Sequence, residues 1–130
     1  YSMEIDESLI KKGDYESDSG YRLLSEMLDL EKPPSAVFVT NYEMTIGAIM
    51  AINDREVKIP EELSIIGFDN IYMAKIVKPA LTIIVQPMEQ IGEAAAGLLL
   101  KRLKGDMSNY PTMLRLKTEL QINKSVKKMI

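Results

Sequence analysis

The chain has 130 residues, of which 46% are hydrophobic and 27% are charged, and its formal net charge is −3. This composition is ordinary for a soluble globular protein and provides enough apolar material for a core. The negative charge argues against nucleic-acid binding by this segment itself, because phosphate binding depends mainly on accumulated Lys and Arg. No apolar run approaches the length of a membrane span, so we expect no membrane partner.

The chain contains neither Cys nor His. It therefore lacks the side chains for a disulfide, a thiolate nucleophile, a zinc site of the usual kind or an imidazole base. These absences exclude most common catalytic designs, and we predict no enzymatic activity, no cofactor and no metal site. The absence of Cys fits a cytoplasmic protein without requiring one. Because the chain starts at Tyr1 and not at Met, we expect a fragment of a longer protein.

The first third of the chain predicts one helix. Residues 1–12 carry few signals, although residues 8–10 favour a short strand end. From Ser17, a candidate N-cap, apolar residues recur at helical spacing and predict a helix that ends before Pro33. Its apolar face consists of Leu23, Leu24, Met27 and Leu28.

Three short apolar runs follow, at residues 36–40, 63–68 and 81–85. They are rich in branched and aromatic residues and lack the alternation of a half-wet sheet. This pattern predicts strands of a parallel sheet covered by helices on both faces. Each run is followed by a polar residue: Asn41, Asp69 and Gln86. Because ligands of such sheets bind beyond the carboxyl ends of the strands, these three residues are candidates for a binding site.

Further helices are predicted between and after these runs. Residues 43–55 carry a stripe of small residues, Gly47, Ala48 and Ala51, which indicates close packing against another element. Residues 70–78 predict a short helix. Pro87 then starts the clearest helix, whose apolar stripe consists of Met88, Ile91, Ala95, Leu98 and Leu99. Residues 112–123 alternate loosely and predict an edge strand or two, followed by a basic, frayed tail.

An ordered set of short motifs runs through nearly the whole chain. They are Gly13-Asp14-Tyr15, Ser19-Gly20-Tyr21, Pro34-Ser35-Ala36-Val37-Phe38, Asn41-x-x-Met44-x-Ile46-Gly47-Ala48, Ile59-Pro60-Glu61-Glu62-Leu63-Ser64-Ile65-Ile66-Gly67-Phe68-Asp69-Asn70, Pro79-x-Leu81-Thr82 and Gln86-Pro87 through Gly92. In order and spacing this set resembles the C-terminal part of LacI/GalR-family transcriptional repressors. Any one motif is weak evidence, but the ordered set is specific.

The resemblance implies an α/β fold, a parallel-sheet three-layer sandwich that forms the C-terminal subdomain of a periplasmic-binding-protein-like type I fold. Residues 1–85 would belong to this effector-binding subdomain, which is incomplete at its N-terminus. Residues 86–110 would form a crossover and a helix of the N-terminal subdomain, and residues 111–130 would supply the returning strands and tail. The DNA-binding headpiece would lie outside this fragment.

The resemblance also suggests roles for residues near the cleft between the subdomains. Tyr15 would stack on the effector, whereas its residue type alone favours packing under a turn. Asp69 would accept hydrogen bonds from adjacent hydroxyl groups, and could also cap the following helix. Asn41 is either an N-cap or a cleft-facing amide, and Gln86 is equally suited to binding ligand and to stitching the hinge.

Two positions depart from the family pattern. Tyr42 stands where the family usually has an Asp that contacts the effector, which leaves the identity of the ligand open. Glu56 stands at a helix end where glycine is common. Because a left-handed residue other than glycine costs about 1 kcal/mol, we expect this helix to end differently.

The function implied is sensing of a small-molecule effector, a sugar or related metabolite, in a homodimeric repressor that binds operator DNA through its headpiece. Residues 44–52 and 71–77 are the expected dimer surfaces. A sugar-binding protein of a transport system is one alternative, because it shares the fold. A second alternative is a degenerate dimerisation module that binds no ligand, because Tyr42 replaces an Asp that usually contacts the effector in the family. An enzyme using Ser and Lys or carboxylates is the least favoured, because no convincing base is present.

Overall fold

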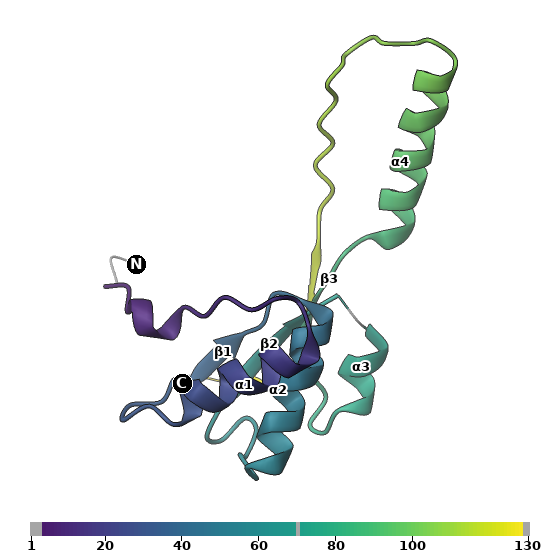
Figure 1. Cartoon of the computed structure of the whole chain (residues 1–130). Coiled ribbons are helices and arrows are strands. Elements are labelled where there is room, and N and C mark those ends of the chain that lie inside the picture. Colours follow the sequence, from purple (N-terminus) through teal and green to yellow (C-terminus); the bar gives the residue numbers. More distant parts are fainter. Residues whose placement is uncertain (1–3, 70, 129–130) are drawn as a thin grey trace.

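The computed structural model of the chain describes residues 4–69 and 71–128. Its elements follow the order η1 (Glu7–Leu9), α1 (Ser17–Leu28), β1 (Ala36–Phe38), α2 (Tyr42–Asp54), β2 (Ser64–Phe68), α3 (Ile71–Ile76), β3 (Thr82–Val85), α4 (Met88–Leu103) and β4 (Glu119–Gln121). Figure 1 shows α1, α2 and α3 gathered at the sheet, with α4 standing apart from them. Asn70, the predicted first residue of the third helix, lies outside the described residues.

The sheet has four strands in the order β1-β2-β3-β4. β1, β2 and β3 are parallel, with Phe38 opposite Ile66 and Ile66 opposite Thr82. β4 is antiparallel to β3. The expected α/β fold with a parallel sheet built from the three apolar runs is therefore confirmed, and the carboxyl ends of these three strands lie at one edge.

The core lies on one face of this sheet. Side chains of the helices pack there against inner strand residues and against Leu81, which precedes β3. Ile65, Leu81 and Ile83 have at most 1% of their surface exposed. On the opposite face, Phe38 is 49% exposed and Ile66 and Ile84 are half-buried. Within the described residues, helices thus cover one face of the sheet, whereas the sequence pattern predicts cover on both.

The small residues of α2 allow close contact with α1, as the stripe predicts. A Cβ atom on Gly47 would lie 1.8 Å from the backbone oxygen of Ser17, and one on Gly20 would lie 2.3 Å from the backbone oxygen of Met44. The backbones of α1 and α2 are therefore in direct contact at two places, once at Gly20 of α1 and once at Gly47 of α2. Glu16, and not Ser17, occupies the N-cap of α1, and it makes no side-chain capping bond.

The C-terminus of α2 corrects the expectation for Glu56. This residue adopts the left-handed conformation, with φ of +55°, in which glycine is favoured. The N–H of Glu56 donates to the carbonyl of Asn53 (3.1 Å) and the N–H of Val57 donates to that of Ile52 (3.0 Å), the two bonds of a Schellman motif. Val57 packs against the core. Burial of this side chain explains why the motif forms without glycine.

The segment after β4 is not frayed, contrary to the prediction. Ser125 is fully buried, and its hydroxyl donates to the carbonyl of Ile65 (2.6 Å) while it accepts from the N–H of Thr82 (2.7 Å). Asn123 donates its side-chain amide to the carbonyl of Leu81 (2.9 Å). The segment therefore stitches together the first residues of β2 and β3.

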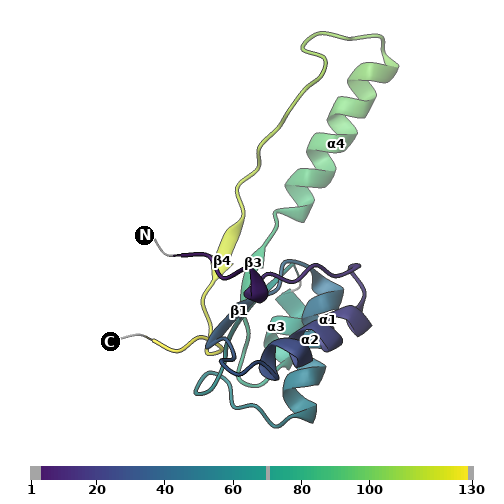
Figure 2. The ribbon, with the colours of Figure 1, turned by 60° about the vertical axis from the view of Figure 1, so that its left-hand side comes forward.

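Two other terminal predictions concern residues 8–10, where the expected strand end is wrong, and residues 112–123, where one edge strand is confirmed over a shorter range. Residues 7–9 form the 3-10 helix η1, in which Asp6 accepts a hydrogen bond from the N–H of Ser8, so no strand end forms there. Within residues 112–123 only Glu119–Gln121 forms a strand. Residues 112–118 run back beside α4 without strand pairing (Figure 2).

α4 forms as predicted, but its apolar stripe is covered only in part, since Ile91 and Leu98 are half-buried. None of its residues is buried, and Leu99 and Leu103 are exposed. Its C-terminus is a second Schellman motif, with Gly105 at a φ of +83°. Arg102 then organises the following loop, because it donates to the carbonyl of Ser108 and to the hydroxyl of Thr112.

We expect Gly47→Ala to destabilise the chain by about 3 kcal/mol or more, because the added methyl group forces α1 and α2 apart. Gly92→Ala is the matched control, since it is also a helical glycine but has no neighbouring atom within 4 Å of the added carbon. It should stabilise its helix by up to about 1 kcal/mol through helix propensity. Urea unfolding measures both, and equal effects would contradict the close contact.

We expect Glu56→Gly to raise the free energy of unfolding by about 1 kcal/mol, because glycine adopts the left-handed conformation without strain. Glu56→Ala serves as the control, since it removes the charge but keeps the backbone conflict. It should give no comparable gain in the same urea titration. A gain of equal size in both variants would trace the effect to the side chain instead.

Candidate functional site

The structure brings two of the predicted residues into direct contact. Asp69 and Gln86 follow the neighbouring strands β2 and β3, and the Gln86 side-chain amide donates to Asp69 Oδ1 at 2.5 Å. The N–H of Asp69 also donates to the carbonyl of Ile84 (2.9 Å), which extends the ladder past the end of β2. The Gln86 side chain therefore links the first residue after β3 to the residue that follows β2. Asp69 Oδ2 can still accept hydrogen bonds from a ligand.

Two of the predicted residues have left-handed backbones. φ is +79° at Asp69 and +71° at Tyr15. Residues other than glycine rarely adopt this conformation, and such strained positions occur preferentially at active sites and ligand contacts. Glu56 and Asn109 share this conformation, so a positive φ by itself does not assign a residue to the site.

Asn41 forms the N-cap of α2. Its side-chain oxygen accepts from the N–H of Met44 (2.9 Å), and its backbone carbonyl accepts from both the N–H and the hydroxyl of Thr45. The capping role is thus present, and the side-chain NH2 of Asn41 stays available to a ligand. Tyr42 is the first residue of α2 and is half-buried.

Tyr15 lies in the turn that leads into α1, and its side chain is 70% exposed. It does not pack under the turn, which is the role that residue type alone favours. The turn itself rests on the start of α2, because a Cβ atom on Gly13 would lie 2.4 Å from the terminal carbon of Met44. The exposed ring is therefore presented from a turn adjacent to the α2 N-terminus.

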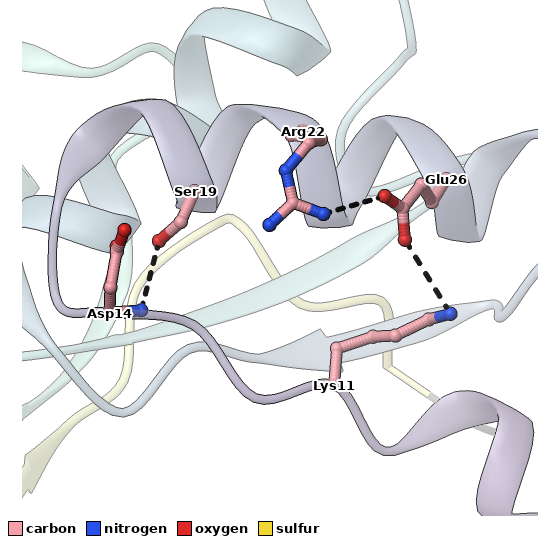
Figure 3. A network of polar contacts seen from close by, with 5 residues as sticks. All are labelled: Lys11, Asp14, Ser19, Arg22 and Glu26. Atoms are coloured by element: carbon pink, nitrogen blue, oxygen red, sulfur yellow. Dashed lines mark hydrogen bonds and ion pairs between the residues drawn. The ribbon is translucent and has the colours of Figure 1, made fainter.

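Polar contacts fix this turn, and Figure 3 shows the one between Asp14 and Ser19. The N–H of Asp14 donates to the Ser19 hydroxyl (3.4 Å), and the Asp14 carboxylate accepts from the N–H of Glu16 (3.0 Å). Hydrogen bonding by the Ser19 side chain and by the Glu16 N–H holds the pKa of Asp14 below its usual value. In the sequence-based prediction Ser19 belongs to a family motif but is given no contact in this turn. Its position five residues after Asp14, at the start of a helix, is the signal that could have identified it.

The arrangement suits recognition of a small polar molecule. One edge of the sheet gathers a carboxylate on Asp69, amides on Asn41 and Gln86, and the N-terminus of a helix. Carboxylates and amides offer the hydrogen-bond acceptors and donors that a polyol needs. Within residues 4–69 and 71–128, no cluster of acidic side chains could hold a metal ion, and no helix is long and apolar enough to cross a membrane.

Comparison with known proteins bears on the whole chain. Residues 3–126 match the model of a family described as periplasmic binding protein-like domain. Over 129 residues, the chain is 33% identical to the HTH-type transcriptional repressor PurR of Actinobacillus pleuropneumoniae serotype 3 (strain JL03), a match that covers 98% of this chain and 38% of that protein.

Two solved structures are also similar. The transcriptional regulator CelR in complex with cellobiose superposes with a TM-score of 0.85 and 32% identity, over 95% of this chain and 37% of that one. A LacI family transcriptional regulator from Enterococcus faecalis V583 with bound ribose has a TM-score of 0.77 and 32% identity, over 88% of this chain and 42% of that one. The chain thus spans less than half the length of each relative.

These matches confirm the resemblance to LacI-type effector domains that the motifs indicate. Because the family model extends over almost all of the sequence, the chain belongs to the periplasmic binding protein-like domain family.

Proposed function

We propose that the chain is the effector-sensing part of a LacI/GalR-type transcriptional repressor. The contact between Asp69 and Gln86 carries this proposal, because it places a carboxylate at the gathered strand ends and links it to the chain that leaves toward α4. An effector bound there would favour one cleft geometry and so control operator binding by population shift. The relatives are named as transcriptional regulators, and the site needs no catalytic group.

The effector we propose is a sugar or a related small metabolite. Asp69 would accept hydrogen bonds from adjacent hydroxyl groups, and Asn41 and Gln86 would supply amide groups. The exposed ring of Tyr15 would stack on the apolar face of the ligand. Tyr42 would provide a single hydrogen bond or a second stacking surface in place of a carboxylate. The bound cellobiose and ribose of two relatives support this class.

The shape of the chain supports the division that we propose. Residues 1–85 would form the C-terminal effector-binding subdomain. Residues 86–110 would belong to the N-terminal subdomain, because α4 stands away from the sheet and buries none of its residues (Figure 2). Residues 111–130 would return from that subdomain and close the sheet through β4. The apolar stripe of α4 would then be covered by the rest of the protein.

We further propose a homodimer in the cytoplasm, with operator DNA bound through a headpiece outside these 130 residues. The small-residue stripe of α2 is already buried against α1 and is unavailable to a partner. The dimer surface would therefore use α3, where Ile76 is 77% exposed, and the exposed Met50 of α2.

The test is a thermal-shift screen of the full-length protein against sugars, sugar phosphates and nucleobases, with calorimetry on any hit. We expect Asp69→Asn to weaken binding by about tenfold or more, because a charge-assisted hydrogen bond contributes about 1.5–3 kcal/mol. Asn has nearly the same size and tolerates the left-handed backbone, so the variant should stay folded.

The control is Asp54→Asn, at the opposite end of α2, where the carboxylate accepts a hydrogen bond from the exposed Tyr21 hydroxyl. It should leave the affinity unchanged. A ligand that binds the Asp69→Asn variant normally would place the site elsewhere. No ligand from any class, in a folded dimer, would favour the dimerisation module instead.

A further inference from the structure

The turn that carries Tyr15 is held by one hydroxyl group, that of Ser19 on α1. This hydroxyl accepts from the N–H of Asp14 (3.4 Å) and donates to the carbonyl of Glu16 (3.0 Å). Figure 3 shows the first of these bonds. A Cβ atom on Gly13 would lie 2.8 Å from the same oxygen atom, so this residue also lies against it. Ser19 therefore contacts the chain on both sides of Tyr15.

The position of the Tyr15 ring depends on the backbone of this turn. The residue is 70% exposed, so it has little packing of its own to fix the ring. The Asp14 carboxylate accepts from the N–H of Glu16 (3.0 Å), which closes an Asx turn around Tyr15. That bond joins the turn to itself, whereas the two bonds of the Ser19 hydroxyl join the turn to α1.

Capping of α1 is the ordinary role for a polar residue in the place of Ser19. Glu16 is the N-cap of α1 and makes no side-chain capping bond, and Ser19 is the third residue of the helix. A side chain at this position commonly reaches back to the N–H of the N-cap residue. Here the Asp14 carboxylate occupies that N–H, and the Ser19 hydroxyl reaches two residues further, past Tyr15. Ser19 is 5% exposed, so water competes little for these bonds.

We propose that Ser19 is a positioning residue of the effector site, which holds the Tyr15 ring where it stacks on the ligand. The inference rests on the proposed sensing function, because Tyr15 is an effector contact only within it. A ring that is held before binding does not have to be ordered by the ligand, and binding then costs less conformational entropy. Ser19 acts through Tyr15 and makes no contact with the ligand itself.

The first measurement needs no effector. In the full-length protein labelled with 15N-Tyr, the amide of Tyr15 is identified by its loss in Tyr15→Phe and should have the order parameter of a rigid backbone, about 0.85. We expect Ser19→Ala to lower this value below about 0.6, the range of flexible segments. The amide of Tyr21, within α1, should not change. Ser25→Ala is the matched control, because within residues 4–69 and 71–128 this second α1 hydroxyl has no hydrogen-bond partner.

The second measurement is a double-mutant cycle by calorimetry, with cellobiose and ribose as probes, the sugars bound to two relatives. Ser19→Ala should weaken binding of the probe by about fivefold, because the ring must then be ordered on binding. Tyr15→Asn removes the ring and tolerates the left-handed backbone. In this background Ser19→Ala should change the affinity by less than about twofold. A serine that only stabilised α1 would give the same loss in both backgrounds.

Two results would overturn the proposal. An unchanged order parameter of Tyr15 in Ser19→Ala would show that other contacts hold the turn. An equal loss of affinity with and without the ring would show that Ser19 does not act through Tyr15. Loss of order at Tyr15 in a protein that binds neither sugar would support the positioning role and would count against the proposed sugar class. The two proposals can therefore fail separately.

Discussion

The parallel pairing of β1, β2 and β3 is the constraint on which the rest of the structure depends. Parallel strands in sequential order place all their carboxyl ends at one edge. Each strand must then be reached by a crossover, and α2 and α3 provide these on the face that holds the core. The polar residues that end the strands are thereby gathered although they are far apart in sequence, which is how Asp69 comes to meet Gln86.

Much of this arrangement could be predicted from the sequence because its signals are local. Short apolar runs that end in polar residues indicate strands, and the stripe through Gly47 indicates a close helix contact. The hydrogen bond between Ser125 and Thr82 could not be predicted, because the two residues lie 43 positions apart in the sequence. A polar residue in a basic tail also gives no local sign of burial. The prediction for the end of α2 at Glu56 was wrong for a related reason. Packing of Val57 against the core overrides the local preference for glycine.

The candidate site was predictable in composition but not in backbone conformation. Residue type placed Asp69 directly after a strand, where the structure has it, whereas β1 ends at Phe38 and Asn41 is the N-cap of α2. The left-handed conformations of Tyr15 and Asp69 leave no mark in the sequence, since neither residue is glycine. Strain of this kind persists only where neighbouring contacts enforce it. At Tyr15 these contacts are the hydrogen bonds around Asp14, and at Asp69 they are the bonds to β3 and to Gln86.

The position of Gln86 gives the proposed sensing mechanism a physical route. It is the first residue after β3 and leads into α4, while its side chain holds the carboxylate of Asp69. A ligand hydroxyl bound at Oδ1 would compete with the Gln86 amide, whereas one bound at Oδ2 would add to it. Binding at the strand ends would therefore change the restraint on the chain that leaves for α4. The reciprocal effect follows from linkage, since a movement of α4 that displaces Gln86 would alter the affinity of Asp69 for its ligand.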